Sequence, residues 1–218
     1  MKFLEVAKKD LKIEFRTKNT LNLMLLFALI TSMMFSLTIP IGVASDVAPA
    51  LLWLVFLFVG MIGYARAFLR EVELETLDGL KISPLSPADI LVGKMIYNLV
   101  LMLLMEIIIL PIFIALFDLH IENPLLAFSS VTLGNTGFVI VASSLSILVL
   151  KSRARELLLP VIMFPIIFPI ISSTIYALSA SMKGTSVEEV YPTFFLIMSF
   201  SIVMFAVSLL TSDYAFSE

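Results

Sequence analysis

Acidic side chains in apolar sequence are the first candidates for chemistry in this chain. Glu106 stands near the middle of an apolar run at 95–117, which is long enough to cross a bilayer. An ionised carboxylate facing lipid there would cost on the order of 3 kcal/mol, so we expect Glu106 to face protein or water, or to be protonated. Two interpretations stay open. One is a contact on a substrate or conformational pathway, and the other is a neutral acid hydrogen-bonded to a neighbouring helix.

The single histidine offers little for a metal or cofactor site. His120 stands between Asp118 and Glu122 at the end of the same run. Imidazole can serve as an axial haem ligand, but a lone histidine beside two carboxylates is more often an exposed loop residue. The chain has no cysteine, which excludes a thiolate metal site or a thiol nucleophile. We therefore expect no metal site.

Motifs for nucleotide or hydrolytic chemistry are missing from the sequence. It contains no G-x-x-x-x-G-K-[ST] phosphate loop, no H-E-x-x-H and no G-x-S-x-G. We expect a non-enzymatic chain whose energy source, if it uses one, is a partner protein. Polar and small residues elsewhere in the apolar runs predict helix contacts, because they let membrane helices approach closely and bond to each other. These residues are Asn98, Thr132, Gly134, Asn135, Thr136 and Gly137.

The charged interval at 66–94 predicts a surface for a partner. It separates two strongly apolar runs and is longer than a simple connection needs. Leucines at three-residue spacing predict a short helix within it. Ser86 and Pro87 have the residue types of the cap and first turn of the next helix. The residues proposed for docking are Glu71, Glu73, Leu74, Glu75, Leu77, Asp78, Leu80, Pro84, Pro87 and Lys94.

The composition indicates the class of protein to which these residues belong. Hydrophobic residues make up 60% of the chain and charged residues 14%, whereas soluble chains carry about 25% charged residues. We predict an all-α polytopic membrane protein, a single domain over 1–218. Its six predicted spans are 21–39, 49–68, 95–117, 124–150, 157–179 and 193–210; the long fourth run could tilt or include a re-entrant piece. The fifth holds Pro160, Pro165 and Pro169, for which we favour a static bend over a moving gate.

The ends of the spans predict the orientation. Residues 1–19 pattern as an amphipathic helix lying in the membrane interface, with Lys8, Lys9, Lys12 and Arg16 towards anionic headgroups. With the N-terminus inside, thirteen of the 14 basic residues fall on the cytoplasmic side and only Lys183 on the other. External loops are then expected at 41–48, 118–123 and 180–192. No cleavable signal peptide is expected. Trp53 and Tyr191 are placed near external boundaries, as headgroup anchors.

The interval and its surroundings resemble a known family. The loop reads E-x-x-x-x-T-L-D-G-L-x-x-S-P-L-S-P-x-D-I-x-x-G-K from Glu71 to Lys94. Together with six spans and a basic N-terminal helix, it is similar to the CcmB family, the permease-like subunit of the cytochrome c maturation ABC complex. The entry to the second span at Ala48–Trp53 and the Leu133-Gly134 pair also fit the resemblance. Members usually have glycine where this chain has Glu75.

The resemblance implies partners and a process. It implies an ABC-2-type permease architecture in the cytoplasmic membrane of a prokaryote, with both termini cytoplasmic. It implies a CcmA-type ATPase docked at 69–94, CcmC- and CcmD-type membrane subunits and release of holo-CcmE. Haem and ATP would come through these partners, with no cofactor held firmly by this chain and no nucleic acid bound. Rival hypotheses are an ABC-2 exporter permease for an unrelated lipid or small molecule, and a non-transporting scaffold for other haem-handling proteins.

Overall fold

A computed structural model describes residues 2–73, 85–149 and 155–216, and all the regular structure in these ranges is helical. Six of its helices are long and apolar enough to cross a membrane, which confirms the prediction of an all-α polytopic membrane protein. The seven helices of the described residues are α1 (Lys2–Thr17), α2 (Asn19–Thr38), α3 (Ile41–Glu73), α5 (Pro87–Leu116), α6 (Pro124–Val149), α7 (Arg155–Met182) and α8 (Val187–Phe216).

The predicted starts of two spans are wrong. Residues 41–48 form the first turns of α3 rather than a loop, so Pro49 lies inside that helix. Helix α8 likewise begins at Val187 and contains Pro192, which leaves only 183–186 between α7 and α8. A proline removes one backbone donor, whereas ending a helix in an apolar medium would expose several unpaired groups. The helices therefore continue through both prolines.

Helices α6 and α7 are both continuous at the level of the backbone. The fourth predicted span is the single helix α6, with no re-entrant piece within Pro124–Val149. Helix α7 runs without interruption through Pro160, Pro165 and Pro169. Whether α7 moves during function stays a prediction.

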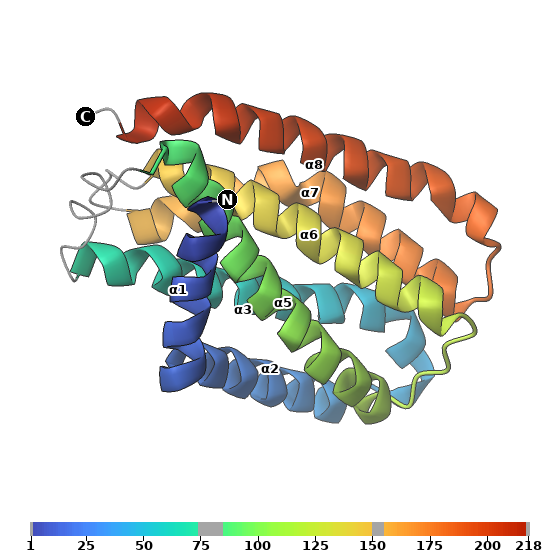
Figure 1. The fold of residues 1–218 in the computed structure, drawn as a ribbon. Coiled ribbons are helices and arrows are strands. Elements are labelled where there is room, and N and C mark those ends of the chain that lie inside the picture. The colour runs from blue at the N-terminus through green and yellow to red at the C-terminus, as the bar shows by residue number, and fades with distance from the viewer. Residues whose placement is uncertain (1, 74–84, 150–154, 217–218) are drawn as a thin grey trace.

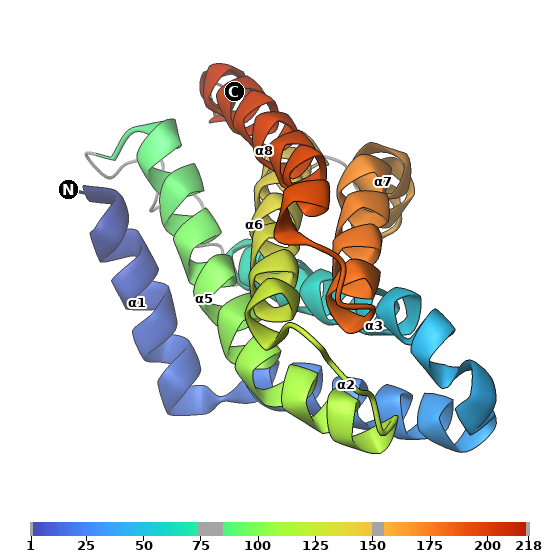
Figure 2. The same ribbon diagram turned by 90° about the vertical axis from the view of Figure 1, so that its right-hand side faces the viewer.

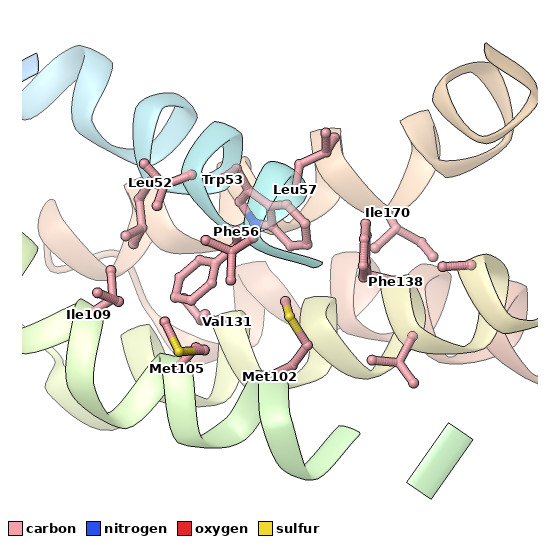
Figure 3. Packing of buried hydrophobic residues seen from close by; sticks show 14 of the residues in the cluster. Leu52, Trp53, Phe56, Leu57, Met102, Met105, Ile109, Val131, Phe138 and Ile170 are labelled. Carbon is pink, nitrogen blue, oxygen red and sulfur yellow. The ribbon is translucent and has the colours of Figure 1, made fainter. Parts of the chain in front are cut away.

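Helix α6 lies at the centre of the bundle and packs against α3, α5, α7 and α8 (Figure 2). The hydrophobic core gathers around it, as the close view in Figure 3 shows. Trp53 and Phe56 come from α3, Met102 and Met105 from α5, and Phe138 from α6 itself. Because of this position, α6 packs directly against α3, α5, α7 and α8, and α2 joins the bundle through α3 and α5.

The two ends of the bundle differ. The three short connections, at 39–40, 117–123 and 183–186, lie at one end (Figure 1). The C-terminal ends of α3, α6 and α8 and the N-terminal ends of α2, α5 and α7 gather at the other. Near this second end, α1 runs across the direction of α2 and α8 (Figure 1) and lies beside α5 (Figure 2). Helices α3 and α5 flank the charged interval. Their ends next to it therefore lie on the same side of the bundle as α1 and the C-terminus of α8.

Candidate functional site

The charged interval begins in the C-terminal end of α3 and ends in the N-terminal part of α5, and the structure describes both of these helix ends. Helix α3 continues to Glu73, so the backbone at Glu71 and Glu73 is helical. Helix α5 begins as predicted: Ser86 is the N-cap, its hydroxyl accepts from the Asp89 backbone N–H at 3.1 Å, and Pro87 occupies the first turn. The remaining docking residues, Leu74, Glu75, Leu77, Asp78, Leu80 and Pro84, lie outside the described residues.

Lys94, the last residue of the interval, is buried between α5 and α1. Its side chain is 2% exposed and its Nζ lies 2.7 Å from Asp10 Oδ2. A buried ion pair holds its partners in a defined geometry, because separating them would leave an uncompensated charge. The sequence pattern places Lys94 on the docking surface and indicates no role for Asp10. In the isolated chain, the Lys94 side chain serves to hold α1 against α5.

Glu106 joins α5 to α6 through both of its carboxylate oxygens. The Thr132 hydroxyl donates to Oε1 at 2.6 Å and the Asn135 side-chain amide donates to Oε2 at 2.9 Å. Glu106 and Asn135 are fully buried. Of the two interpretations, the acid hydrogen-bonded to a neighbouring helix describes the geometry, with Thr132 and Asn135 as the donors. A role on a conformational pathway stays a prediction. We call Glu106, Thr132 and Asn135 the α5–α6 clasp.

A second polar contact, which the sequence pattern does not reveal, joins α3 to α6. The Tyr64 hydroxyl donates to the Val139 carbonyl at 2.8 Å and lies 2.9 Å from the Ser143 hydroxyl. Asn98 of α5 is buried close to the same hydroxyl. In the sequence, Tyr64 is simply one residue within the predicted span 49–68. Its position two residues before Arg66 is the one signal available, because a tyrosine next to the charged end of a span often needs a polar partner.

The small residues of α6 make room for the neighbouring helices, as predicted. An added Cβ at Gly134 would lie 2.4 Å from Trp53 Cζ2 and 2.5 Å from Thr174 Oγ1. Helices α3 and α7 therefore both approach the backbone of α6 at this residue. Close approach of this kind increases van der Waals contact between membrane helices, which lack a hydrophobic driving force between them.

The prediction that Trp53 anchors at an external boundary is wrong. Its side chain is 1% exposed and packs over Gly134 in the core (Figure 3). The reason is that α3 begins at Ile41 and not at Pro49, which moves Trp53 towards the middle of the helix. Tyr191 is exposed near the start of α8, and its role as a headgroup anchor stays a prediction.

His120 lies in the connection after α5 and is 87% exposed, with Nε2 3.5 Å from Glu122 Oε1. A cavity of about 350 Å³ at this end is lined in part by Phe117, His120 and Lys183. No group of three or more His, Cys, Asp or Glu side chains within the described ranges could hold a metal ion. The exposed-loop interpretation therefore describes His120.

These contacts show what the arrangement can do mechanically. Helix α3 ends in the charged interval and helix α5 begins in it. Each of these helices is bonded through a buried polar side chain to the central helix α6. Displacement of either helix would strain a hydrogen bond between buried groups, which is costly to break in a protein interior. The site is therefore suited to transmit movement between the end that carries the interval and the middle of the bundle.

Comparison with known protein families gives a match over almost the whole chain. The family model for the CcmB protein matches residues 1–217. No protein with a curated description matches the chain.

Proposed function

We propose that this chain couples ATP hydrolysis by a separate subunit to haem handling. The chain belongs to the CcmB family, which supplies the permease subunit of a haem-exporting ABC transporter in cytochrome c biogenesis. The family match over 217 of 218 residues is the observation that carries this proposal. The ATPase is a CcmA-type subunit, the membrane partners are CcmC- and CcmD-type subunits, and the step driven is release of holo-CcmE.

The charged interval is the proposed contact with the ATPase. Glu71, Glu73, Glu75 and Asp78 would face basic residues of the ATPase. Exposed ion pairs contribute about 0–1 kcal/mol each, so these acids orient the partner more than they strengthen its binding. Leu74, Leu77 and Leu80 supply affinity by entering an apolar groove, because an amphipathic helix binds through its apolar face.

Movement then passes into the bundle along two helices. A displacement at the interval pushes on the C-terminal end of α3 and the N-terminal end of α5. The Tyr64 contact and the α5–α6 clasp support this route, since each bonds one of these helices to α6. Rigid-body movement of packed helices is a common mode of switching in proteins. Pro84 and Pro87 help to define the angle at which the interval enters α5.

Haem and ATP are bound by the partner subunits in this proposal. His120 is given no role as a haem ligand, because it is exposed and stands in no cluster of metal-binding side chains within the described residues. The chain carries no phosphate-loop motif for a nucleotide. Its own contribution is the coupled movement of its helices and the surfaces that assemble the complex.

The test is copurification of the ATPase with the Leu77→Asp/Leu80→Asp double variant. Burial of a leucine is worth about 1.5–3 kcal/mol, so removing two should lower recovery of the ATPase at least tenfold. The amount of the variant in the membrane should not change. Val187→Asp is the matched control, because Val187 is an exposed apolar residue at the opposite end of the bundle. Full recovery of the ATPase with the double variant would contradict the proposed contact.

A further inference from the structure

Helix α1 is fixed to the bundle along one side. Val6 and Ala7 are buried, and an added Cβ at Gly93 of α5 would lie 2.6 Å from Val6 Cβ. The Asp10–Lys94 ion pair lies on the same side. These contacts determine which face of α1 is turned towards α5 and leave the opposite face exposed.

The last turn of α1 is fixed to α2 by an unusual cap. Glu14 is buried, and its carboxylate accepts from the Thr20 N–H at 2.7 Å, the Leu21 N–H at 2.9 Å and the Thr20 hydroxyl at 2.8 Å. The N-terminus of a helix favours negative charge, since its first N–H groups have no partner within the helix. The position of α1 is thus determined by α2 as well as by α5, and α1 is a fixed part of the fold.

The exposed face of α1 has two neighbouring stripes. Lys8, Lys12 and Arg16 are exposed at four-residue spacing, which places them on one line along the helix. Leu4 is 45% exposed and Phe15 47% exposed. These two are eleven residues apart, which is close to three whole turns, so they share a second line beside the first. Glu5 is the exposed acid of α1.

The surroundings of α1 favour a membrane over a protein as the occupant of this face. Helix α1 lies at the outer edge of the molecule beside α5 (Figure 2) and packs against α5 and α2 among the described helices. Its C-terminal end meets the start of α2 (Figure 1), where Leu23 and Leu26 are also exposed apolar side chains. Apolar residues next to a basic line match the boundary between acyl chains and anionic headgroups.

We propose that the exposed face of α1 binds anionic phospholipid of the leaflet next to the charged interval. Leu4 and Phe15 enter the upper acyl region, and Lys8, Lys12 and Arg16 contact the headgroup phosphates. Each basic residue near an anionic membrane surface adds about 1 kcal/mol, or about fivefold in binding. The preference for anionic lipid should therefore fall stepwise as these charges are removed.

The experiment places a fluorescent probe at the exposed face. Trp53 is the single tryptophan of the chain and is buried, so lipid should quench it little. The Phe15→Trp variant, in vesicles of lipid brominated on the acyl chains, reports contact at α1 by the additional quenching. Comparing brominated phosphatidylglycerol with brominated phosphatidylcholine gives the relative affinity for anionic lipid. Lys183→Gln, at the opposite end of the bundle, is the control for loss of one charge.

The results separate the proposal from its rivals. We expect stronger quenching by phosphatidylglycerol than by phosphatidylcholine. Adding Lys12→Gln should lower the preference for phosphatidylglycerol about fivefold, and adding Lys183→Gln should leave that preference unchanged. Equal quenching by the two lipids would overturn the selection by charge. No quenching by either would overturn the contact with lipid. Quenching that disappears when the partner ATPase is bound would assign the face to a protein, and would likewise overturn the proposal.

Discussion

Glu106 illustrates how one buried carboxylate can set the register between two membrane helices. Both of its oxygens accept from α6, so a slide of α5 along α6 would break two hydrogen bonds together. The Asn135 side-chain oxygen has no hydrogen-bond partner within the described residues. An unpaired buried acceptor destabilises the fold that contains it, so the Asn135 side-chain oxygen offsets part of the stabilisation that the clasp provides.

A double-mutant cycle measures the clasp. Glu106→Leu should lower the free energy of unfolding in mixed micelles by about 1–3 kcal/mol, because it leaves Asn135 and Thr132 without an acceptor. Combining it with Thr132→Val should give a coupling energy of about 0.5–2 kcal/mol. Glu106→Leu combined with Ser172→Ala is the control, since Ser172 is on α7 and bonds within its own helix. Zero coupling in the first pair would show that the contact contributes no energy.

Two lysines near the same carboxylate provide a matched comparison at the residue scale. Lys94 and Lys9 lie 2.7 Å and 3.3 Å from Asp10, but their side chains are 2% and 48% exposed. Lys94→Met should destabilise the protein by about 3–5 kcal/mol, because Asp10 is left nearly buried without its closest cation. Lys9→Met should change stability by less than about 1 kcal/mol, because exposed pairs are weak.

The measurement for these two variants is unfolding in mixed micelles, with amide hydrogen exchange of residues 2–17 as the local readout. Faster exchange confined to α1 in Lys94→Met would show that the ion pair fixes this helix. Equal effects of the two substitutions on stability would mean that the burial of the Asp10–Lys94 pair does not increase its contribution to stability.

At the scale of elements, the length of the apolar runs is enough to predict the six spans. It does not predict which helices each span packs against. A span is apolar all round, since lipid and core are both apolar, so its buried face cannot be told from its lipid face. For this reason the sequence indicates no role for Tyr64, whereas the error at Trp53 comes from the misplaced start of α3. The Asp10–Lys94 pair joins residues 84 positions apart, which no local pattern reveals. The cap on α5 is predictable because its residues are adjacent in sequence.

Two glycines test whether close approach to α6 stabilises the bundle. Gly134→Ala would bring its Cβ to 2.4 Å from α3 and 2.5 Å from α7, so it should destabilise the protein by about 1–3 kcal/mol. Gly42→Ala should be neutral or stabilise by about 0.5–1 kcal/mol, because nothing lies within 4 Å and alanine favours the helix. Thermal unfolding in detergent compares the two variants. A neutral Gly134→Ala would mean that the three helices can separate at this point without loss.

At the scale of the whole molecule, the proposed coupling requires one particular end of the bundle to face the cytoplasm. Thirteen of 14 basic residues favour the end that holds α1 and the ends of α3 and α5 next to the interval. The chain has no cysteine, so a single introduced thiol reports one position without background. Thr17 at the end of α1 and Ser186 between α7 and α8 are exposed and lie at opposite ends.

In right-side-out membrane vesicles, a membrane-impermeant maleimide should therefore label Ser186→Cys and leave Thr17→Cys unlabelled until the vesicles are opened. Labelling of both after opening is the control for reactivity. The reverse pattern would place the charged interval on the side without ATP. A soluble ATPase could then not reach α3 and α5, and the clasp and the Tyr64 contact would hold the bundle together without receiving any movement from a partner.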